Sequence, residues 1–295
     1  MAELPKDVPA LVELLARHGY LADRGLATAI HLADALAQPL LLEGAAGVGK
    51  TELAKVLARA TDRELVRLQC YEGIDANQAL YEWDYARQMI YIRGLGPGST
   101  GRTEDVFSAD FLQERPLLRA LRAGAHAVLL IDEVDRADDE FEAFLLEVLS
   151  DYQVTVPELG TIRAEHPPLV ILTSNRTRDL HDALRRRCLY HWIDFPDLAR
   201  EVAMVRAQAP EVPAALARAV AAAVERMREL GLLKSPGVAE TIGWARALAY
   251  LGAPDEAGLD PELAEATLGV VVKDRDDLER IRAELPGILT AAARA

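Results

Sequence analysis

Short apolar runs alternate with amphipathic stretches through the first two thirds of the chain. The runs are rich in Leu, Val and Ile and end at glycine or polar residues, which is typical of buried strands; they lie at 39–43, 65–68, 126–131, 169–173 and 191–193. Apolar residues recur at helical spacing in the stretches between them, at 9–37, 50–60, 117–123 and 138–149. Because strands alternate with helices, the pattern predicts a parallel sheet in a three-layer α/β/α domain.

The pattern changes after Pro196, where the chain becomes helical and rich in alanine. We therefore expect N-terminal helices at 1–37, an α/β domain at 38–196 and a small all-helical domain at 197–295. Two features interrupt the α/β pattern. Residues 71–110 concentrate aromatic side chains and read as an insertion, and residues 152–163 around Pro157 predict a β-hairpin.

Charge and composition narrow the possible functions. The formal net charge of -14 disfavours binding to nucleic acid, whose phosphates repel an acidic surface. Two cysteines provide neither a disulfide framework nor a zinc quartet. The N-terminus lacks the pattern of a signal peptide, and no apolar run is long enough for a membrane span. We expect a cytoplasmic protein.

A glycine-rich loop follows the first predicted strand and precedes a helix. It fits the pattern G-x-x-x-x-G-K-[ST], a phosphate-binding loop; its residues are Gly44, Ala45, Ala46, Gly47, Val48, Gly49, Lys50 and Thr51. Backbone N–H groups of such a loop surround phosphate oxygens, and the following helix adds its positive end. Lys50 would contact the phosphates and Thr51 would bind Mg²⁺. The loop predicts ATP and Mg²⁺ as cofactors.

A pair of adjacent carboxylates ends the predicted strand at 126–131. Asp132 would hold Mg²⁺, and Glu133 would act as the general base that activates water. A nucleotide-binding protein that only switches does not need the second acid. The acids that follow, Asp135 among them, read as a solvated helix start.

Two further polar features lie downstream. Asn175 follows the strand at 169–173 and is placed to orient the attacking water, although Asn is also common in turns. Arg185, Arg186 and Arg187 end a short predicted helix. One of them reaches a neighbouring subunit's nucleotide, or the three merely compensate the helix dipole.

Taken together, these elements resemble an AAA+ ATPase over almost the whole chain, and more narrowly the MoxR group. The resemblance implies Walker A at 44–51, Walker B at 128–133, sensor 1 at Asn175 and an arginine finger at Arg187, with Arg186 second. It also implies a helical lid and a homo-oligomer, a hexameric ring. The family's sensor 2 arginine is missing, since Gly237 follows Ser235-Pro236. Lys234 and Arg246 are the possible substitutes.

A still narrower resemblance is to the carbon monoxide dehydrogenase accessory ATPases; it lies in residues 68–75, 79–85, 184–189, 239–242 and 244–248. It implies an ATP-driven maturation chaperone for a molybdenum hydroxylase, with a von Willebrand factor A domain protein as partner and the metalloenzyme as client. The aromatic residues at 71–91 would be the client surface or a small satellite core. Two alternatives remain: a nucleotide-gated scaffold with slow hydrolysis, and a nucleic-acid-associated motor subunit.

Overall fold

The computed structural model describes residues 4–94, 106–157, 159–252 and 259–294, which form two compact units. The first, here called the sheet unit, comprises Met1–Leu14, Ala22–Glu43 and Thr51–Trp192. The second, the helical unit, comprises Leu15–Leu21, Gly44–Lys50 and Ile193–Ala295. By its contacts the glycine-rich loop thus belongs to the helical unit. The domain boundary at 197 stays a prediction.

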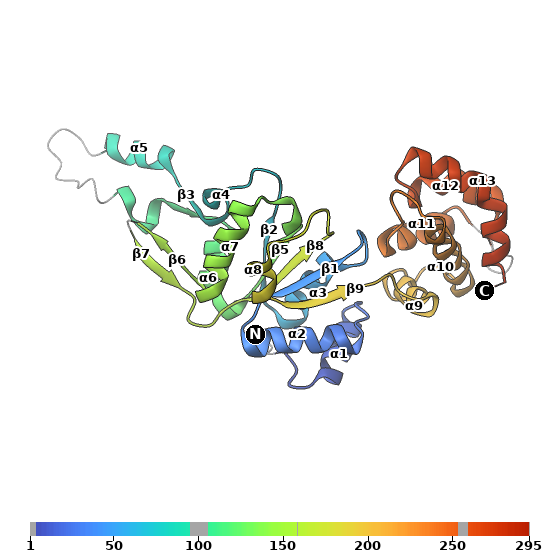
Figure 1. Ribbon diagram of the computed structural model, residues 1–295, viewed down its shortest axis with the longest axis horizontal. Coiled ribbons are helices and arrows are strands. Elements are labelled where there is room, and N and C mark those ends of the chain that lie inside the picture. Colours follow the sequence, from blue (N-terminus) through green and yellow to red (C-terminus); the bar gives the residue numbers. More distant parts are fainter. Residues whose placement is uncertain (1–3, 95–105, 158, 253–258, 295) are drawn as a thin grey trace. The chain divides into compact units, whose positions relative to one another are not determined.

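A five-stranded sheet with the order β2-β5-β8-β1-β9 forms the centre of the sheet unit (Figure 1). Its strands are β1 (Leu40–Gly44), β2 (Glu64–Gln69), β5 (Ala127–Asp132), β8 (Leu169–Ser174) and β9 (Leu189–Ile193). The pairs β2–β5, β5–β8 and β8–β1 are parallel. Every residue of β1, β5 and β8 is buried, so both faces of the sheet are covered. The predicted layered α/β fold is confirmed.

The helices before and between these strands are α1 (Val8–Arg17), α2 (Arg24–Leu36), α3 (Lys50–Thr61), α4 (Ala76–Leu80), α5 (Tyr85–Gly94), α6 (Pro116–Ala123), α7 (Asp139–Asp151) and α8 (Asp182–Arg187). Those that pack on the sheet do so through leucines and alanines that repeat at helical spacing. Helix α6 begins with a proline, buries Leu117, Leu118 and Leu121, and packs against β2 and β5. Helix α2 packs against β8.

Short elements complete the sheet unit. Among the described residues, 3-10 helices form at η2 (Ala109–Phe111), η3 (Gly124–His126) and η4 (Val134–Arg136). Two antiparallel ribbons pair β3 (Tyr81–Trp83) with β4 (Leu112–Glu114), and β6 (Gln153–Val156) with β7 (Gly160–Arg163). The second ribbon occupies the stretch where the sequence predicts a hairpin.

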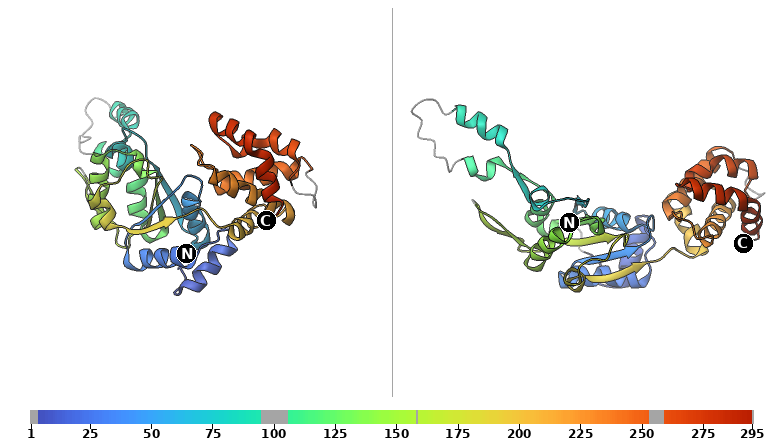
Figure 2. Two further views of the ribbon diagram at one scale, coloured as in Figure 1. Left: turned by 45° about the vertical axis from the view of Figure 1, so that its right-hand side comes forward. Right: turned by 45° about the horizontal axis from the view of Figure 1, so that its top comes forward.

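The aromatic stretch at 71–110 divides into a packed part and an exposed part; its residues 95–105 lie outside the described ranges. Trp83 is buried and makes edge contacts with Tyr81 and Phe107 at centroid distances of 6.0 and 5.4 Å. Helix α5, by contrast, exposes large apolar side chains: Tyr85, Met89, Ile90, Tyr91 and Ile92. In Figure 2 this cyan helix stands away from the central sheet.

The described residues from 193 onward form the helices α9 (Leu198–Gln208), α10 (Ala214–Glu229), α11 (Val238–Tyr250), α12 (Pro261–Val271) and α13 (Arg275–Ala292) of the helical unit. Helix α10 lies against α9, α11 and α13. The Trp244 indole is fully buried and donates to Thr267 Oγ1 at 2.7 Å. Buried Glu201 accepts two bonds from Arg228, at 2.7 and 2.8 Å, so its charge is compensated. None of the helices described is long and apolar enough to cross a membrane.

Candidate active site

The glycine-rich loop connects β1 to α3 and curls back on itself. Gly47 and Gly49 have φ of 78° and 97°, a left-handed conformation that glycine adopts without steric cost. Lys50 is buried, and its ammonium donates to the carbonyl oxygens of Gly44 and Ala45, both at 2.7 Å. The loop therefore encloses a fixed positive charge at the N-terminus of a twelve-residue helix, an arrangement suited to binding an anion.

Within the helical unit, the start of α11 lies directly against this loop. The Val238 amide donates to the Gly47 carbonyl at 2.9 Å. A Cβ atom at position 237 would lie 2.5 Å from Gly47 Cα, closer than any real Cβ contact. Gly237, which stands where the resemblance implies an arginine, is thus the residue that lets two backbones touch.

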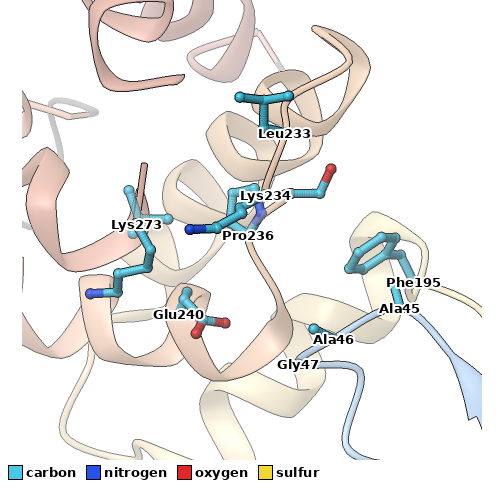
Figure 3. Close-up of a pocket in the computed structure, with 11 residues that line it drawn as sticks. Ala45, Ala46, Gly47, Phe195, Leu233, Lys234, Pro236, Glu240 and Lys273 are labelled. Carbon is cyan, nitrogen blue, oxygen red and sulfur yellow. The ribbon is translucent and has the colours of Figure 1, made fainter. Parts of the chain in front are cut away.

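A pocket of about 440 Å³ adjoins the same contact (Figure 3). The loop contributes Ala45, Ala46 and Gly47, and the helical segments contribute Lys234, Lys273 and Glu240, among others. Of the two possible substitutes for the missing arginine, Lys234 lines this pocket. Arg246 instead donates to Glu211 at 2.9 Å and to the Gln208 carbonyl. Lys273 is a pocket cation that the sequence reasoning missed.

In the sheet unit, Thr51 and Asp132 are in direct contact. The Thr51 hydroxyl donates to Asp132 Oδ1 at 2.8 Å, and the Thr173 hydroxyl donates to the same oxygen at 2.6 Å. Thr173 Oγ1 also accepts from the Glu133 amide at 2.9 Å. Strand β8 therefore fixes both carboxylate-bearing residues through one hydroxyl.

Glu133 follows β5 with φ of 55°, a left-handed conformation that is uncommon for a residue with a side chain. Its Oε2 accepts from Gln69 and from Arg136, both at 3.0 Å. Asn175 Nδ2 lies 3.5 Å from its Oε1, a long hydrogen bond. The structure thus brings three predicted residues together at one edge of the sheet: Asp132, Glu133 and Asn175.

The three arginines of α8 have different partners. Arg185 donates to buried Glu43 at 3.0 Å, beside the Tyr190 hydroxyl, which donates to the same oxygen at 3.0 Å. Arg187 donates to Ser150 Oγ at 2.6 Å. The Arg186 side chain is exposed and, within the described part of the chain, makes no hydrogen bond or ion pair. Arg186 and Arg187 thus stay at the surface while Arg185 is anchored.

Several residues of the site escaped the sequence reasoning. Thr173 pairs in register next to Asp132, because Ile131 lies opposite Leu172. Gln69 and Arg67 are polar residues that alternate on β2, and Gln69 lies opposite Asp132. Thr173 and Gln69 could have been identified in the sequence as polar residues near the end of an apolar strand. The expectation that Asp135 is solvated is wrong: it is 2% exposed, and its Oδ2 accepts from the Thr177 amide at 2.9 Å.

The donor set at Thr51 and Asp132 fits Mg²⁺. A hydroxyl and a carboxylate oxygen lie side by side, and Mg²⁺ prefers oxygen ligands. The described residues contain no group of three His, Cys, Asp or Glu side chains able to hold a metal ion. Mg²⁺ in nucleotide sites commonly takes one or two protein ligands and completes its shell with phosphates and water.

The thiol of Cys70, a buried cysteine beside this site, has low reactivity. Burial first, and then the negative charges of Asp132, Asp135 and Glu133, together raise the pKa of the Cys70 thiol to about 12. The Cys70 amide donates to the Asp132 carbonyl at 2.9 Å. The residue therefore packs behind the carboxylates rather than acting as a nucleophile.

Part of the chain is similar in sequence to known proteins. Chaperone protein ClpB 2 of Parasynechococcus marenigrum is 35% identical over 138 residues, which cover 46% of this chain and 13% of ClpB 2. The chain thus spans only a small part of that relative. An uncharacterized protein of Staphylococcus haemolyticus is 28% identical over 165 residues, covering 54% of this chain and 56% of that protein.

A solved structure shares the fold. A single-residue variant of Thermotoga maritima RuvB has a TM-score of 0.50 and 17% identity, and the match covers 94% of this chain and 75% of that chain. At this identity the likeness concerns the fold alone.

One family matches in sequence as well. The family described as "AAA domain (dynein-related subfamily)" matches residues 39–188, just over half of the chain. That range contains the glycine-rich loop, Asp132, Glu133, Asn175 and the three arginines of α8. The chain belongs to the AAA family, in its dynein-related subfamily.

Proposed function

We propose that this protein binds ATP with Mg²⁺ and hydrolyses it to ADP and phosphate. The observation that carries the proposal is the contact between Thr51 and Asp132, because it joins the first residues of the phosphate-loop helix to the end of β5. Loop amides and Lys50 would hold the phosphates. Thr51 and Asp132 would hold Mg²⁺, which neutralises charge on the phosphates when bound.

The acid beside Asp132 supplies the hydrolytic step. Glu133 accepts a proton from water as that water attacks the terminal phosphorus, and the bond to the leaving oxygen breaks. Asn175, within reach of the Glu133 carboxylate, orients the water. Gln69 and Arg136 restrain the same carboxylate, so the base is held in one place before the substrate arrives.

Two substitutions test this proposal. Lys50→Ala should abolish binding of a fluorescent ATP analogue. Glu133→Gln should bind the analogue normally but lower phosphate release about 100- to 10,000-fold, the usual contribution of a general base. Glu140→Gln, an exposed acid of α7, serves as the control and should hydrolyse normally. Normal turnover by the Glu133 variant would remove Glu133 from the mechanism.

We further propose a homo-oligomeric ring, a hexamer, in which Arg186 or Arg187 of one subunit contacts the nucleotide of the next. Both guanidinium groups are exposed, which an in-trans role requires. Arg186→Ala and Arg187→Ala should show which of the two arginines contacts the neighbouring nucleotide. Loss of that arginine should lower turnover about 1,000-fold or more and leave nucleotide binding intact. Mass photometry that finds only monomers of the Glu133→Gln variant with ATP contradicts the ring.

For the biological role, we propose an ATP-driven maturation chaperone of the MoxR group, closest to the carbon monoxide dehydrogenase accessory ATPases. The segments at 68–75, 79–85 and 184–189 support that assignment, and the ClpB relative is itself called a chaperone. The client would be a molybdenum hydroxylase, and the partner a von Willebrand factor A domain protein. Co-purification of tagged protein with such a partner tests the role; a slow basal rate that no partner changes favours a nucleotide-gated scaffold instead.

Helix α5 is the surface we assign to the client. Its exposed apolar side chains, Ile90 at 72% and Met89 at 52%, lie outside the core. The acidic net charge of -14 agrees with a protein client rather than a nucleic acid.

A further inference from the structure

Asp132 receives four donated hydrogen bonds, and they divide by charge. Its Oδ1 accepts from two neutral hydroxyls, those of Thr51 and Thr173. Its Oδ2 accepts twice from Arg67, from Nε at 3.1 Å and from Nη2 at 2.6 Å. Arg67 therefore places a full positive charge on the carboxylate oxygen that the hydroxyls leave open.

The buried Asp132 carboxylate needs a nearby cation to compensate its charge. Asp132 is 2% exposed, and a buried charge is costly unless it is paired. The pair nevertheless differs from a permanent one. In the Arg228–Glu201 pair the side chains are 10% and 0% exposed, and each nitrogen binds a different oxygen. The Arg67 side chain is 49% exposed and contacts one oxygen only.

Half-exposure makes the Arg67 guanidinium displaceable. When it leaves Asp132 it returns to water, so the loss of one ion pair is largely offset by hydration. Arg67 Nη2 also donates to Gln69 Oε1, two residues along β2 and on the same side of the strand. A second acceptor thus keeps the arginine near the site after it releases the carboxylate.

We propose that Arg67 is a positioning residue that neutralises and orients Asp132 until Mg²⁺ binds, and that the guanidinium and the metal compete for this carboxylate. The inference rests on the proposed function, in which Thr51 and Asp132 are the metal ligands. Two cations on one carboxylate repel each other, and the doubly charged ion prevails. Arg67 accordingly stabilises the metal-free protein and weakens its apparent affinity for Mg²⁺.

The test uses Arg67→Gln, which removes the charge, and Arg67→Lys, which keeps it. Arg119→Gln is the matched control. Arg119 also forms an ion pair with an acid, Glu64, but Glu64 begins β2, whereas Gln69 ends the strand beside Asp132. Mg²⁺ is titrated at a fixed concentration of fluorescent ADP, so that no turnover is needed. Melting temperatures are then measured in EDTA without nucleotide, and again with Mg²⁺ and ADP.

For Arg67→Gln we expect the Mg²⁺ concentration at half-maximal binding to fall about 1.5- to fivefold, the range of a half-exposed ion pair. Its melting temperature in EDTA should fall below that of the wild type, and Mg²⁺ with ADP should narrow the difference. Arg67→Lys should lie between the two in both measurements, and it serves if Arg67→Gln does not fold. Arg119→Gln should keep the wild-type midpoint.

Each other result is decisive. An unchanged or raised Mg²⁺ midpoint in Arg67→Gln overturns the competition. An unchanged melting temperature in EDTA overturns the neutralising role. If the wild type itself shows no Mg²⁺-dependent ADP binding, the proposed function fails, whereas wild-type binding with an insensitive Arg67 variant refutes only the inference.

Discussion

Replacing Gly237 by alanine should separate the start of α11 from the phosphate loop. Gly237 has φ of -84° and ψ of 178°, which alanine adopts freely, so the cost is purely steric. The new Cβ would lie 2.5 Å from Gly47 Cα, 2.8 Å from Gly47 C and 2.8 Å from Glu240 Oε2, whereas ordinary contact begins at 3.4 Å. The Glu240 side chain can move aside, but the two Gly47 atoms are backbone, so the two backbones must move apart by about 1 Å.

This movement breaks a defined hydrogen bond. The bond from the Val238 amide to the Gly47 carbonyl is 2.9 Å long, and lengthening it by about 1 Å exceeds hydrogen-bond range. Overpacking of this kind costs about 1–3 kcal/mol. The Val238 amide should therefore exchange with deuterium about five- to a hundredfold faster, at about 1.4 kcal/mol per factor of ten.

Hydrogen exchange followed by mass spectrometry, on peptides that begin at least three residues before Val238, measures this directly. Gly243→Ala is the control on the same helix: its Cβ would meet Val270 Cγ1 at 3.7 Å, an ordinary contact. Alanine inside a helix gains about 0.5–1 kcal/mol over glycine, so this variant should be stabilised. Unchanged protection of Val238 in Gly237→Ala, or a stabilised variant, refutes the reasoning.

Three further predictions concern other parts of the molecule. Burial raises the pKa of Cys70 and of Cys188 to about 12, so few thiolates form near neutral pH. Alkylation of these thiols by iodoacetamide at pH 8 should therefore be about a thousandfold slower than in the unfolded chain. The alkylation rate should still rise about tenfold from pH 8 to 9, because the thiolate fraction rises about tenfold. An alkylation rate equal to that of the unfolded chain contradicts this. Thr267→Val leaves the Trp244 indole N–H without its acceptor and should lower the free energy of unfolding by about 1–3 kcal/mol, while the exposed Thr290→Val should change it little in the same urea titration. Ile90→Asp should leave basal hydrolysis intact but weaken stimulation by a bound client, and equal stimulation of both proteins removes α5 as the client surface.

The fold was predictable from sequence because its signals are local. The apolar runs that become β1, β5 and β8 are buried on both faces, so they stand out without knowledge of their neighbours. Lys50, Thr51, Asp132 and Glu133 were found because each follows or precedes such a run at a fixed spacing.

The remaining site residues depend on register and packing. Thr173 reaches Asp132 only because β8 pairs with β5 in one register, and Arg67 reaches it only because β2 lies on the other side of β5. Asp135 looked like a surface acid because its partner, Thr177, lies 42 residues away. Gly237 looked like a missing arginine because a sequence does not reveal how closely two backbones approach.

The anchoring of Arg185 has a consequence for how the chain can vary. The Glu43 carboxylate, 1% exposed, receives Arg185 and Tyr190 on one oxygen, and Ser174 lies 3.4 Å from the other. The three consecutive arginines therefore have different roles: Arg185 links α8 to β1, the strand before the phosphate loop, whereas the other two are exposed. Deletion of one arginine would leave two, so a neighbouring residue, Leu184 or Cys188, would take one of the three positions. The three positions are therefore not interchangeable, although the same residue type stands at each.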